Sequence, residues 1–534
     1  MPDPLIYTTL AAAGDVSETF IYVTLALAVG MLIWDCVEVG RNDAVNLVNA
    51  VFGARVMRRR TAVWIAGLAV IIGASASSTV LETARKGIFD PTFLSMTDAL
   101  AIYTSVYIVD TVLLYTYSAF GMPVSTTASL VFELLGASFV VGGSTIVNWN
   151  KSGMVILAIL MSIVITGVAA FMVQRALRGA IRHRTADLVT LLLHGGWIGG
   201  ALLAGLCYFL LLKGMKHFVT VQTIKDEWLS AIDTPVLLLL LWAIFAIIIH
   251  LLLVTFRERM ARLFFPVLAV IGMIAMSIAF GQNDLANCAS PGLASLNLID
   301  AHFKGETVKS ATQAEIKPWM LLGCGVLIFL GMTTRNAQRV TRAQVNTGSM
   351  GDHVRLWAPQ WCIGLAWLIL RKRGELPALA PEPAVSERGK TVHYDTLRAS
   401  VIMSVSASVI ATASSLGLPV STTYVGFAAV LATGMADRIF ERGDAALKLG
   451  RSIWVVFSWF SAALIAAVSA GLVCLLIQQF SVVGIAIALM LNFVVRRVAK
   501  QRSDAQDDRL QREADERKAA LGNRAGVEVP DDAD

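Results

Sequence analysis

Two short polar motifs, each present twice, occur in a chain that is otherwise strongly apolar. The first reads Gly-Arg-Asn-Asp-Ala-Val-Asn at 40–46 and Gly-Gln-Asn-Asp-Leu-Ala-Asn at 281–287, with the shared pattern G-x-N-D-x-x-N. The second reads Gly-Met-Pro-Val-Ser-Thr-Thr at 121–127 and Gly-Leu-Pro-Val-Ser-Thr-Thr at 417–423. Because two different motifs recur in the same order in both halves, the chain is predicted to contain an internal repeat.

The Asn-Asp motif offers oxygen ligands for a cation. Charged and amide side chains are costly inside apolar runs, so Asp43 and Asp284 require a functional or pairing role. The Asn that follows each Asp by three residues lies on the same helical face. The motif glycine is expected to loosen the helix and free backbone carbonyls. Six residues are therefore predicted to coordinate Na⁺ or take up a proton: Asn42, Asp43, Asn46, Asn283, Asp284 and Asn287.

The P-V-S-T-T motif offers donors for an anion. Gly followed by Pro interrupts a span, and Pro is tolerated at the first position of a new helix. The N-terminus of that helix presents free N–H groups and the positive end of its dipole, which together bind anions. The hydroxyl groups predicted to join these donors belong to Ser125, Thr126, Thr127, Ser421, Thr422 and Thr423. The two motifs together suit a cation-coupled carrier of a tetrahedral oxyanion, with Asp43 and Asp284 beside the substrate.

Each motif also has a structural interpretation. One Ser-Thr-Thr in a membrane commonly serves helix packing, and one Asn-Asp at the end of a span is commonly an interfacial loop. Duplication favours the functional interpretation of both. His194 and His250 are interpreted as ordinary helix residues, and the arginines at 55–60 as a topology determinant. Interhelical pairing or cavity lining, with a proton relay as the alternative, is expected of four further acidic residues: Asp35, Glu38, Asp110 and Glu133.

Membrane-spanning helices must position these motifs. The 534 residues are 56% hydrophobic and 15% charged, whereas soluble proteins carry about 25% charged residues. The six cysteines are scattered and form no metal or disulfide pattern. We predict an all-α polytopic membrane protein with twelve or thirteen spans of about 20 residues. The candidate spans are 19–40, 62–82, 97–117, 123–145, 153–173, 189–212, 234–256, 261–281, 318–335, 397–416, 419–437, 451–475 and 480–496.

The loops predict an orientation. If the spans alternate, the arginine-rich loops all fall on one side, which the positive-inside rule places in the cytoplasm. We therefore predict a bacterial inner-membrane protein with its N-terminus outside and its C-terminus inside. The formal charge of +6 then reflects cytoplasmic loops and not nucleic acid binding. In this orientation the two copies of each motif point in opposite directions, which predicts inverted repeats with broken or re-entrant helices around a shared site.

The chain is predicted to divide into six segments. These are an extracytoplasmic N-terminus at 1–18, the first repeat with its connecting spans at 19–255, the start of the second repeat at 256–335, a cytoplasmic linker at 336–396, the rest of the second repeat at 397–497 and a charged cytoplasmic tail at 498–534. Within the linker, 355–370 is typical of an interfacial helix. Neither the linker nor the tail contains a catalytic pattern, so we expect no enzyme and no cofactor beyond the coupling ion.

The paired motifs resemble those of the inorganic phosphate transporter (PiT) family of secondary carriers, over 19–145 and 261–437. The resemblance implies symport of inorganic phosphate with Na⁺ or H⁺. It places Asp43, Asn46, Asp284 and Asn287 at the phosphate and cation sites, and the two Ser-Thr-Thr runs on the anion. The expected partners are phosphate or sulfate, the lipid bilayer and a second copy of the chain in a homodimer.

Four residues depart from the family pattern. A His commonly follows Ser-Thr-Thr, where this chain has Ala128 and Tyr424; Arg41 replaces a small residue, and Pro291 is unusual. These departures leave a sulfate permease as the alternative. Phosphate near neutral pH retains a proton that it can donate to a carboxylate, whereas sulfate offers none. The presence of both motif carboxylates therefore favours phosphate.

Two other classes of protein fit less well. An intramembrane aspartyl protease could use Asp43 and Asp284 as a catalytic pair, but it would not need duplicated Ser-Thr-Thr helix starts. A nutrient sensor that does not transport would be expected to carry a soluble signalling domain, which neither the linker nor the tail resembles.

Overall fold

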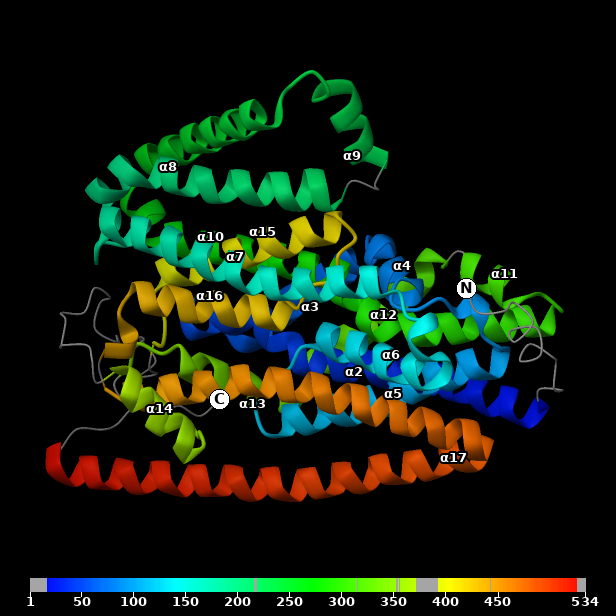
Figure 1. Ribbon diagram of the computed structural model, residues 1–534. Helices are drawn as coiled ribbons and strands as arrows, with labels where there is room; N and C mark the ends of the chain where they lie inside the picture. Colours follow the sequence, from blue (N-terminus) through cyan, green and yellow to red (C-terminus); the bar gives the residue numbers. More distant parts are fainter. Residues whose placement is uncertain are drawn as a thin grey trace.

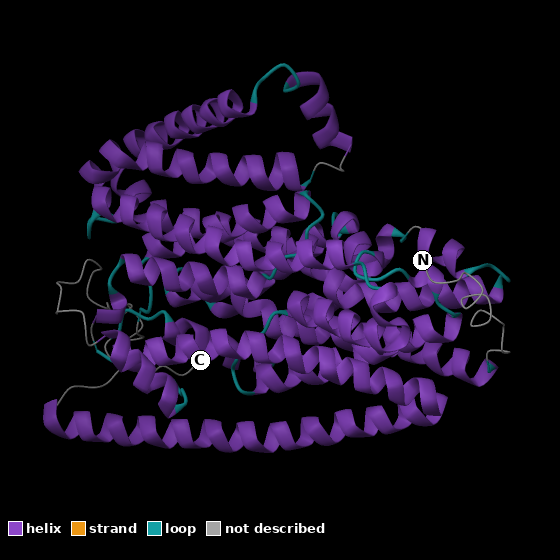
Figure 2. Ribbon diagram, viewed as in Figure 1, coloured by secondary structure: helices purple, strands orange, loops and turns teal. Residues whose placement is uncertain are grey.

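The structure is an elongated bundle of helices (Figure 1). The computed structural model describes residues 17–215, 219–314, 316–351, 354, 356–370, 392–441 and 443–525. Within these ranges the chain is helical with short connections, and the one strand-like pairing is an isolated bridge between Phe89 and Val147 (Figure 2). The prediction of an all-α polytopic membrane protein is confirmed.

The helices that precede the second Asn-Asp motif come largely from apolar runs without internal proline. In chain order they are α2 (Glu18–Gly53), α3 (Arg59–Ala74), α4 (Ser78–Lys86), η1 (Pro91–Phe93), α5 (Met96–Ala119), α6 (Thr126–Gly142), η2 (Gly143–Thr145), α7 (Trp149–Ile181), α8 (Leu188–Leu206), η3 (Cys207–Gly214), α9 (Val219–Thr223) and η4 (Ile224–Trp228).

The remaining helices contain the second copy of both motifs. They are α10 (Thr234–Phe303), α11 (Val308–Gln313), α12 (Pro318–Met332), α13 (Arg335–Thr347), α14 (Gln360–Leu370), α15 (Thr396–Ser415), α16 (Thr422–Ala436), η5 (Ile439–Glu441) and α17 (Ala445–Ala525).

Eight of the described helices are long and apolar enough to cross a membrane, fewer than the thirteen predicted spans. Two of the eight contain a break with positive φ, at Arg257 in α10 and at Ser481 in α17, and Figure 1 shows α17 turning back on itself. The predicted span at 62–82 is divided, because α3 ends at Ala74 and α4 begins at Ser78. Merged and divided helices together account for much of the difference.

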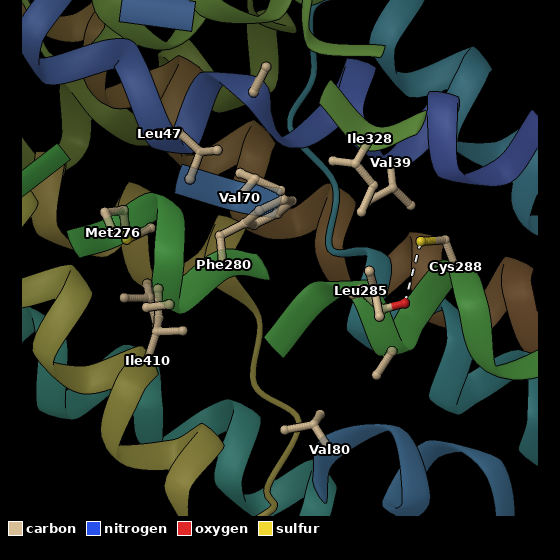
Figure 3. Close-up of a cluster of buried hydrophobic side chains, with 14 of the residues drawn as sticks. Val39, Leu47, Val70, Val80, Met276, Phe280, Leu285, Cys288, Ile328 and Ile410 are labelled. Carbon is tan, nitrogen blue, oxygen red and sulfur yellow. Dashed lines mark hydrogen bonds between the residues drawn. The ribbon is translucent and has the colours of Figure 1, made fainter. Parts of the chain in front are cut away.

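The two Asn-Asp helices are each packed against a helix from the other half. A side chain on Gly40 of α2 would collide with the backbone of Ile328 in α12, and one on Gly281 of α10 would collide with Val70 in α3. Figure 3 shows the apolar core at both crossings. The prediction that these glycines loosen the helix is wrong, since α2 and α10 are helical through both motifs. Their role is to permit close approach of two backbones.

The segment predicted as a linker is partly helical. It contains most of α13 and all of α14, while 371–391 lies outside the described residues, as do 1–16 of the N-terminal segment. α14 has 11 residues, too few to span a bilayer, and exposes Trp361 and Trp367. The tail continues α17 as a helix as far as Ala525. The segment boundaries themselves stay predictions.

Candidate anion and cation site

The second motif begins a helix in both copies, as predicted, but the first helical residues are Thr126 and Thr422 and not the prolines three positions earlier. α5 ends at Ala119, Gly121 has φ +63°, and α6 begins at Thr126. Ser125 caps α6, because its Oγ accepts a hydrogen bond from the backbone N–H of Ala128 at 2.9 Å. In α16 the same cap joins Ser421 Oγ to the N–H of Tyr424 at 3.1 Å. The two caps fix where α6 and α16 begin and satisfy one free N–H group of each helix.

The carboxylate of Asp43 lies against the second helix start. Thr423 donates to Asp43 Oδ1 at 2.7 Å, and Asn46 donates to the same oxygen at 3.2 Å. Thr126 lies 3.2 Å from Asp43 Oδ2. A carboxylate from α2 is therefore held by a hydroxyl from α16, which is more than 370 residues away in the chain.

The carboxylate of Asp284 lies against the first helix start. Its Oδ1 accepts from Asn287 at 2.9 Å and lies 3.2 Å from Thr126 and 3.5 Å from Thr127. Asn283 donates to Oδ2 at 3.3 Å. Each Asp-Asn pair thus shares one helical face, as the spacing predicts, and the hydroxyl of Thr126 lies between the two carboxylates.

The two helix starts are also tied directly to each other. Thr127 donates to the carbonyl of Val420 at 3.0 Å, and Thr423 donates to the carbonyl of Val124 at 3.2 Å. These carbonyls belong to the P-V segment of the opposite motif. The site is consequently a single structure made from both halves, with neither half complete alone.

The site is closed to solvent and retains unused oxygen atoms. All twelve predicted residues are at most 1% exposed. No donor from the described part of the chain reaches Oδ1 of Asn42, Asn46 or Asn287, and the hydroxyl of Thr422 has no partner there. A buried amide oxygen without a partner is costly. The structure brings the predicted residues together, while their roles as ligands stay predictions.

Two residues near the site, Tyr107 and Pro291, were given no role from the sequence. The hydroxyl of Tyr107 in α5 donates to the carbonyl of Cys288 and accepts from the N–H of Gly292, both at 2.7 Å. It is therefore inserted between the two ends of a hydrogen bond of α10, one turn after Asn287. Pro291 removes a neighbouring N–H from the same turn. The signal in the sequence was this proline within an apolar run.

The other unusual residues have structural partners. Tyr424 stacks on Trp459 with ring centroids 4.0 Å apart, and the indole N–H of Trp459 donates to the carbonyl of Pro123 at 3.3 Å. Arg41 pairs with Glu38 at 2.9 Å, and so does Arg496 of α17. The interhelical pair predicted for Glu38 is confirmed.

The other three predicted acidic residues, Asp35, Asp110 and Glu133, form no ion pair with the described residues. Asp35 faces Asp110 across α2 and α5, with Glu133 nearby. No donor from the described residues reaches the carboxylate oxygens of these three side chains. His194 accepts a hydrogen bond from Trp197 at 3.2 Å, as an ordinary helix residue does.

Comparisons with known proteins agree with this geometry. The model of the phosphate transporter family matches residues 39–344. A protein of Pyrococcus horikoshii that is named as a phosphate permease is 28% identical over 466 residues, covering 85% of this chain and 97% of that one. One of Haemophilus influenzae with the same type of name is 24% identical over 437 residues, covering 79% and 89%.

A solved structure shows the same fold. The structure, titled the sodium-dependent phosphate transporter, matches with a TM-score of 0.64 and 21% identity, covering 86% of this chain and all of that one. At that identity the likeness concerns the arrangement of helices and not the ligands.

Proposed function

Because the chain belongs to the phosphate transporter family, whose members are transporters and not enzymes, we propose that it imports inorganic phosphate by symport with a cation. The substrate binds between the two halves, which open alternately to the two sides of the membrane. The observation that carries this proposal is that each Asn-Asp motif bonds with a threonine of the opposite half: Asp43 with Thr423, and Asn287 with Thr127.

The donors of the site suit a tetrahedral oxyanion. The N-termini of α6 and α16 meet there, and each presents N–H groups and threonine hydroxyls at the positive end of a helix dipole. Asp43 and Asp284 accept hydrogen bonds, so a phosphate that retains a proton can donate to either one. Sulfate has no proton to donate, and the relatives described above are named for phosphate.

The charge of the site explains the need for a cation. Among the described residues that form hydrogen bonds in the site, none is basic, and two are carboxylates. Phosphate would add negative charge to a buried, already acidic centre, which is strongly unfavourable without a compensating cation. Cation and phosphate must therefore bind together, and this requirement couples their transport.

Sodium fits the unused ligands better than a proton. Na⁺ binds oxygen atoms, and Oδ1 of Asn46 and Oδ1 of Asn287, beside Asp43 and Asp284, accept no hydrogen bond from the described residues. A proton would neutralise a carboxylate but leave both amide oxygens without a partner. We therefore assign Na⁺ as the coupling ion, held by one or both Asp-Asn pairs.

The packing of the halves supports alternating access. α12 from the second half covers α2, and α3 from the first half covers α10, around a site that is buried from both sides. This exchange fits inverted repeats that rock against one another. The start of α2 and the end of α17 lie at opposite ends of the bundle (Figure 1). With the arginine-rich loops this supports an inner-membrane protein with its N-terminus outside.

Uptake of labelled phosphate into proteoliposomes tests the proposal. We expect accumulation driven by an inward Na⁺ gradient, strong loss in Asp43→Asn and normal uptake in the control Asp226→Asn, which removes an exposed carboxylate from the short helix η4. Accumulation driven only by a pH gradient would replace Na⁺ with H⁺. Absence of any gradient-driven phosphate uptake, with robust uptake of sulfate, would refute the assigned substrate.

A further inference from the structure

A cavity lined by basic residues, separate from the Asp-Thr site, lies at the end of the bundle where α6 begins. Its volume is about 400 Å³, and Gly121 is part of its wall. The cavity is distinct from the Asp-Thr site, but it borders the turn that leads into the first helix start. Arg451 joins the two regions, because its Nη2 donates to the carbonyl of Gly121 at 3.0 Å. By the orientation proposed above, this end faces the cytoplasm.

The charges in this cavity come from two different parts of the chain. Four arginines of the helical body line it: Arg55, Arg339, Arg342 and Arg451. The carboxylates among its described lining residues, Asp507 and Asp508, both belong to the tail portion of α17. The body alone therefore provides four positive charges, and the tail compensates two of them.

The contacts between tail and body are solvated ion pairs. Arg339 Nη2 lies 2.8 Å from Asp504 Oδ1, and Arg339 Nε lies 2.8 Å from Asp507 Oδ2. Both carboxylates are 46% exposed. Ion pairs with that exposure contribute little to stability, so a competing anion can replace them. Arg342 is exposed, and its guanidinium group makes no hydrogen bond or ion pair with the described part of the chain.

We propose that this cavity binds a phosphate group from the cytoplasmic side, and that the tail carboxylates compete with it for the arginines. A guanidinium fork matches the oxygen atoms of phosphate, as it matches those of a carboxylate. Binding displaces Asp504 and Asp507 from Arg339 and releases the tail from α13, whose backbone at Arg339 packs near Gly121. The concentration of phosphate in the cytoplasm thereby affects the turn at Gly121, which leads into α6 and the proposed anion site.

This inference rests on the proposed function in two respects only: the orientation of the chain in the membrane, and the choice of phosphate as the probe. The test uses the full chain in nanodiscs and measures hydrogen–deuterium exchange of residues 499–511 as inorganic phosphate is added. The background variant Asp43→Asn/Asp284→Asn disables the transmembrane site. Transport can then fail while the tail still responds, and the tail can fail to respond while transport is normal.

We expect phosphate to increase tail exchange in both backgrounds, with saturation. Arg342→Gln should raise the phosphate concentration for half-maximal exchange by about tenfold, the factor for one lost charge-assisted hydrogen bond. Asp504→Asn/Asp507→Asn should lower that concentration, since the competitor is weakened. The matched control Arg259→Gln removes an exposed arginine outside the cavity lining and should leave it unchanged.

Three outcomes would overturn the proposal: no response of the tail to phosphate, equal responses of Arg342→Gln and Arg259→Gln, or a response that disappears in the Asp43→Asn/Asp284→Asn background. Nanodiscs with and without phosphatidylglycerol distinguish the source of the phosphate group. If free phosphate acts in neutral lipid, the ligand is soluble. If the tail moves only with phosphatidylglycerol, a lipid headgroup occupies the same arginines.

Discussion

The two copies of the motif pair make the same kind of contact. In each copy, the Asn-Asp residues contact a threonine of the other half. Asn46 donates to Thr423 at 3.0 Å, and its counterpart Asn287 donates to Thr127 at 2.8 Å. Asp43 accepts from Thr423 at 2.7 Å, and its counterpart Asp284 lies 3.5 Å from Thr127. Each half therefore completes the site of the other. A repeat whose halves are complete only together cannot lose one copy of the motifs and keep the other functional.

The two copies differ at the residues that flank these contacts. Thr126 lies within hydrogen-bonding distance of both carboxylates, whereas its counterpart Thr422 lies near Asp284 but forms no hydrogen bond with the described residues. Asn283 binds both backbone groups of Val420, whereas Asn42 donates to one serine hydroxyl. The second Asn-Asp copy is thus held more firmly. The groups without a hydrogen bond to the described residues, such as the Thr422 hydroxyl, are those we propose as ligands of the transported ions.

The strongest test of these contacts between the two halves is to neutralise the carboxylates of Asp43 and Asp284 in turn. Asp43→Asn and Asp284→Asn should each reduce phosphate uptake by about 100-fold, because an amide cannot replace a buried charge worth about 3 kcal/mol. The initial rate in proteoliposomes measures this loss. Since Thr126 lies between both carboxylates, the double variant should lose little more than either single one. Losses that simply multiply would show that the two copies act independently.

The paired amides test which copy holds the cation. Asn46→Ala and Asn287→Ala should each raise the Na⁺ concentration for half-maximal uptake, by about tenfold if that oxygen is a ligand. If only one variant responds, the cation belongs to that copy alone. If neither responds, the amide oxygens are not ligands. Maximal rates at saturating Na⁺ separate lost affinity from lost folding.

The counterparts Thr126 and Thr422 should respond differently to substitution, one in stability and the other in affinity for phosphate. Thr126→Val removes a hydroxyl that bonds with the carboxylates and should lower the free energy of unfolding by about 1 kcal/mol. Thr422→Val should leave the stability unchanged and raise the KM for phosphate about fivefold, because the free hydroxyl is a donor for the anion. Thr422→Ser retains the hydroxyl and serves as the control. Equal losses of stability in both valine variants would contradict the difference between the copies.

The flanking amides test how firmly each copy of the Asn-Asp motif is held, through stability alone. Asn283→Ala leaves the backbone of Val420 without its partners and should lower the unfolding free energy by about 2 kcal/mol, against about 1 kcal/mol for Asn42→Ala. Thermal unfolding in detergent compares the two. A larger loss in Asn42→Ala would mean that the first copy is the more firmly held.

The motifs predicted the local structure of the site well. The start of a new helix after Gly121 followed from residue preferences that act within a few positions, although the cap by Ser125 was not predicted. The shared face of Asp284 and Asn287 followed from helix geometry. The role of Gly40 could not be predicted, because its constraint is the backbone of Ile328, which is nearly 300 residues away. Tyr107 was missed for the same reason: its partner is a carbonyl on another helix.

By itself the sequence determined that the chain is a helical membrane protein with a duplicated site, because hydropathy, helix starts and repeated motifs are properties of short segments. It also named the twelve residues of the site. Only the tertiary structure decided that Asp43 bonds with Thr423 of the opposite copy, and that Thr126 lies between both carboxylates. Such contacts depend on how helices distant in sequence pack against one another, and no local preference specifies that packing.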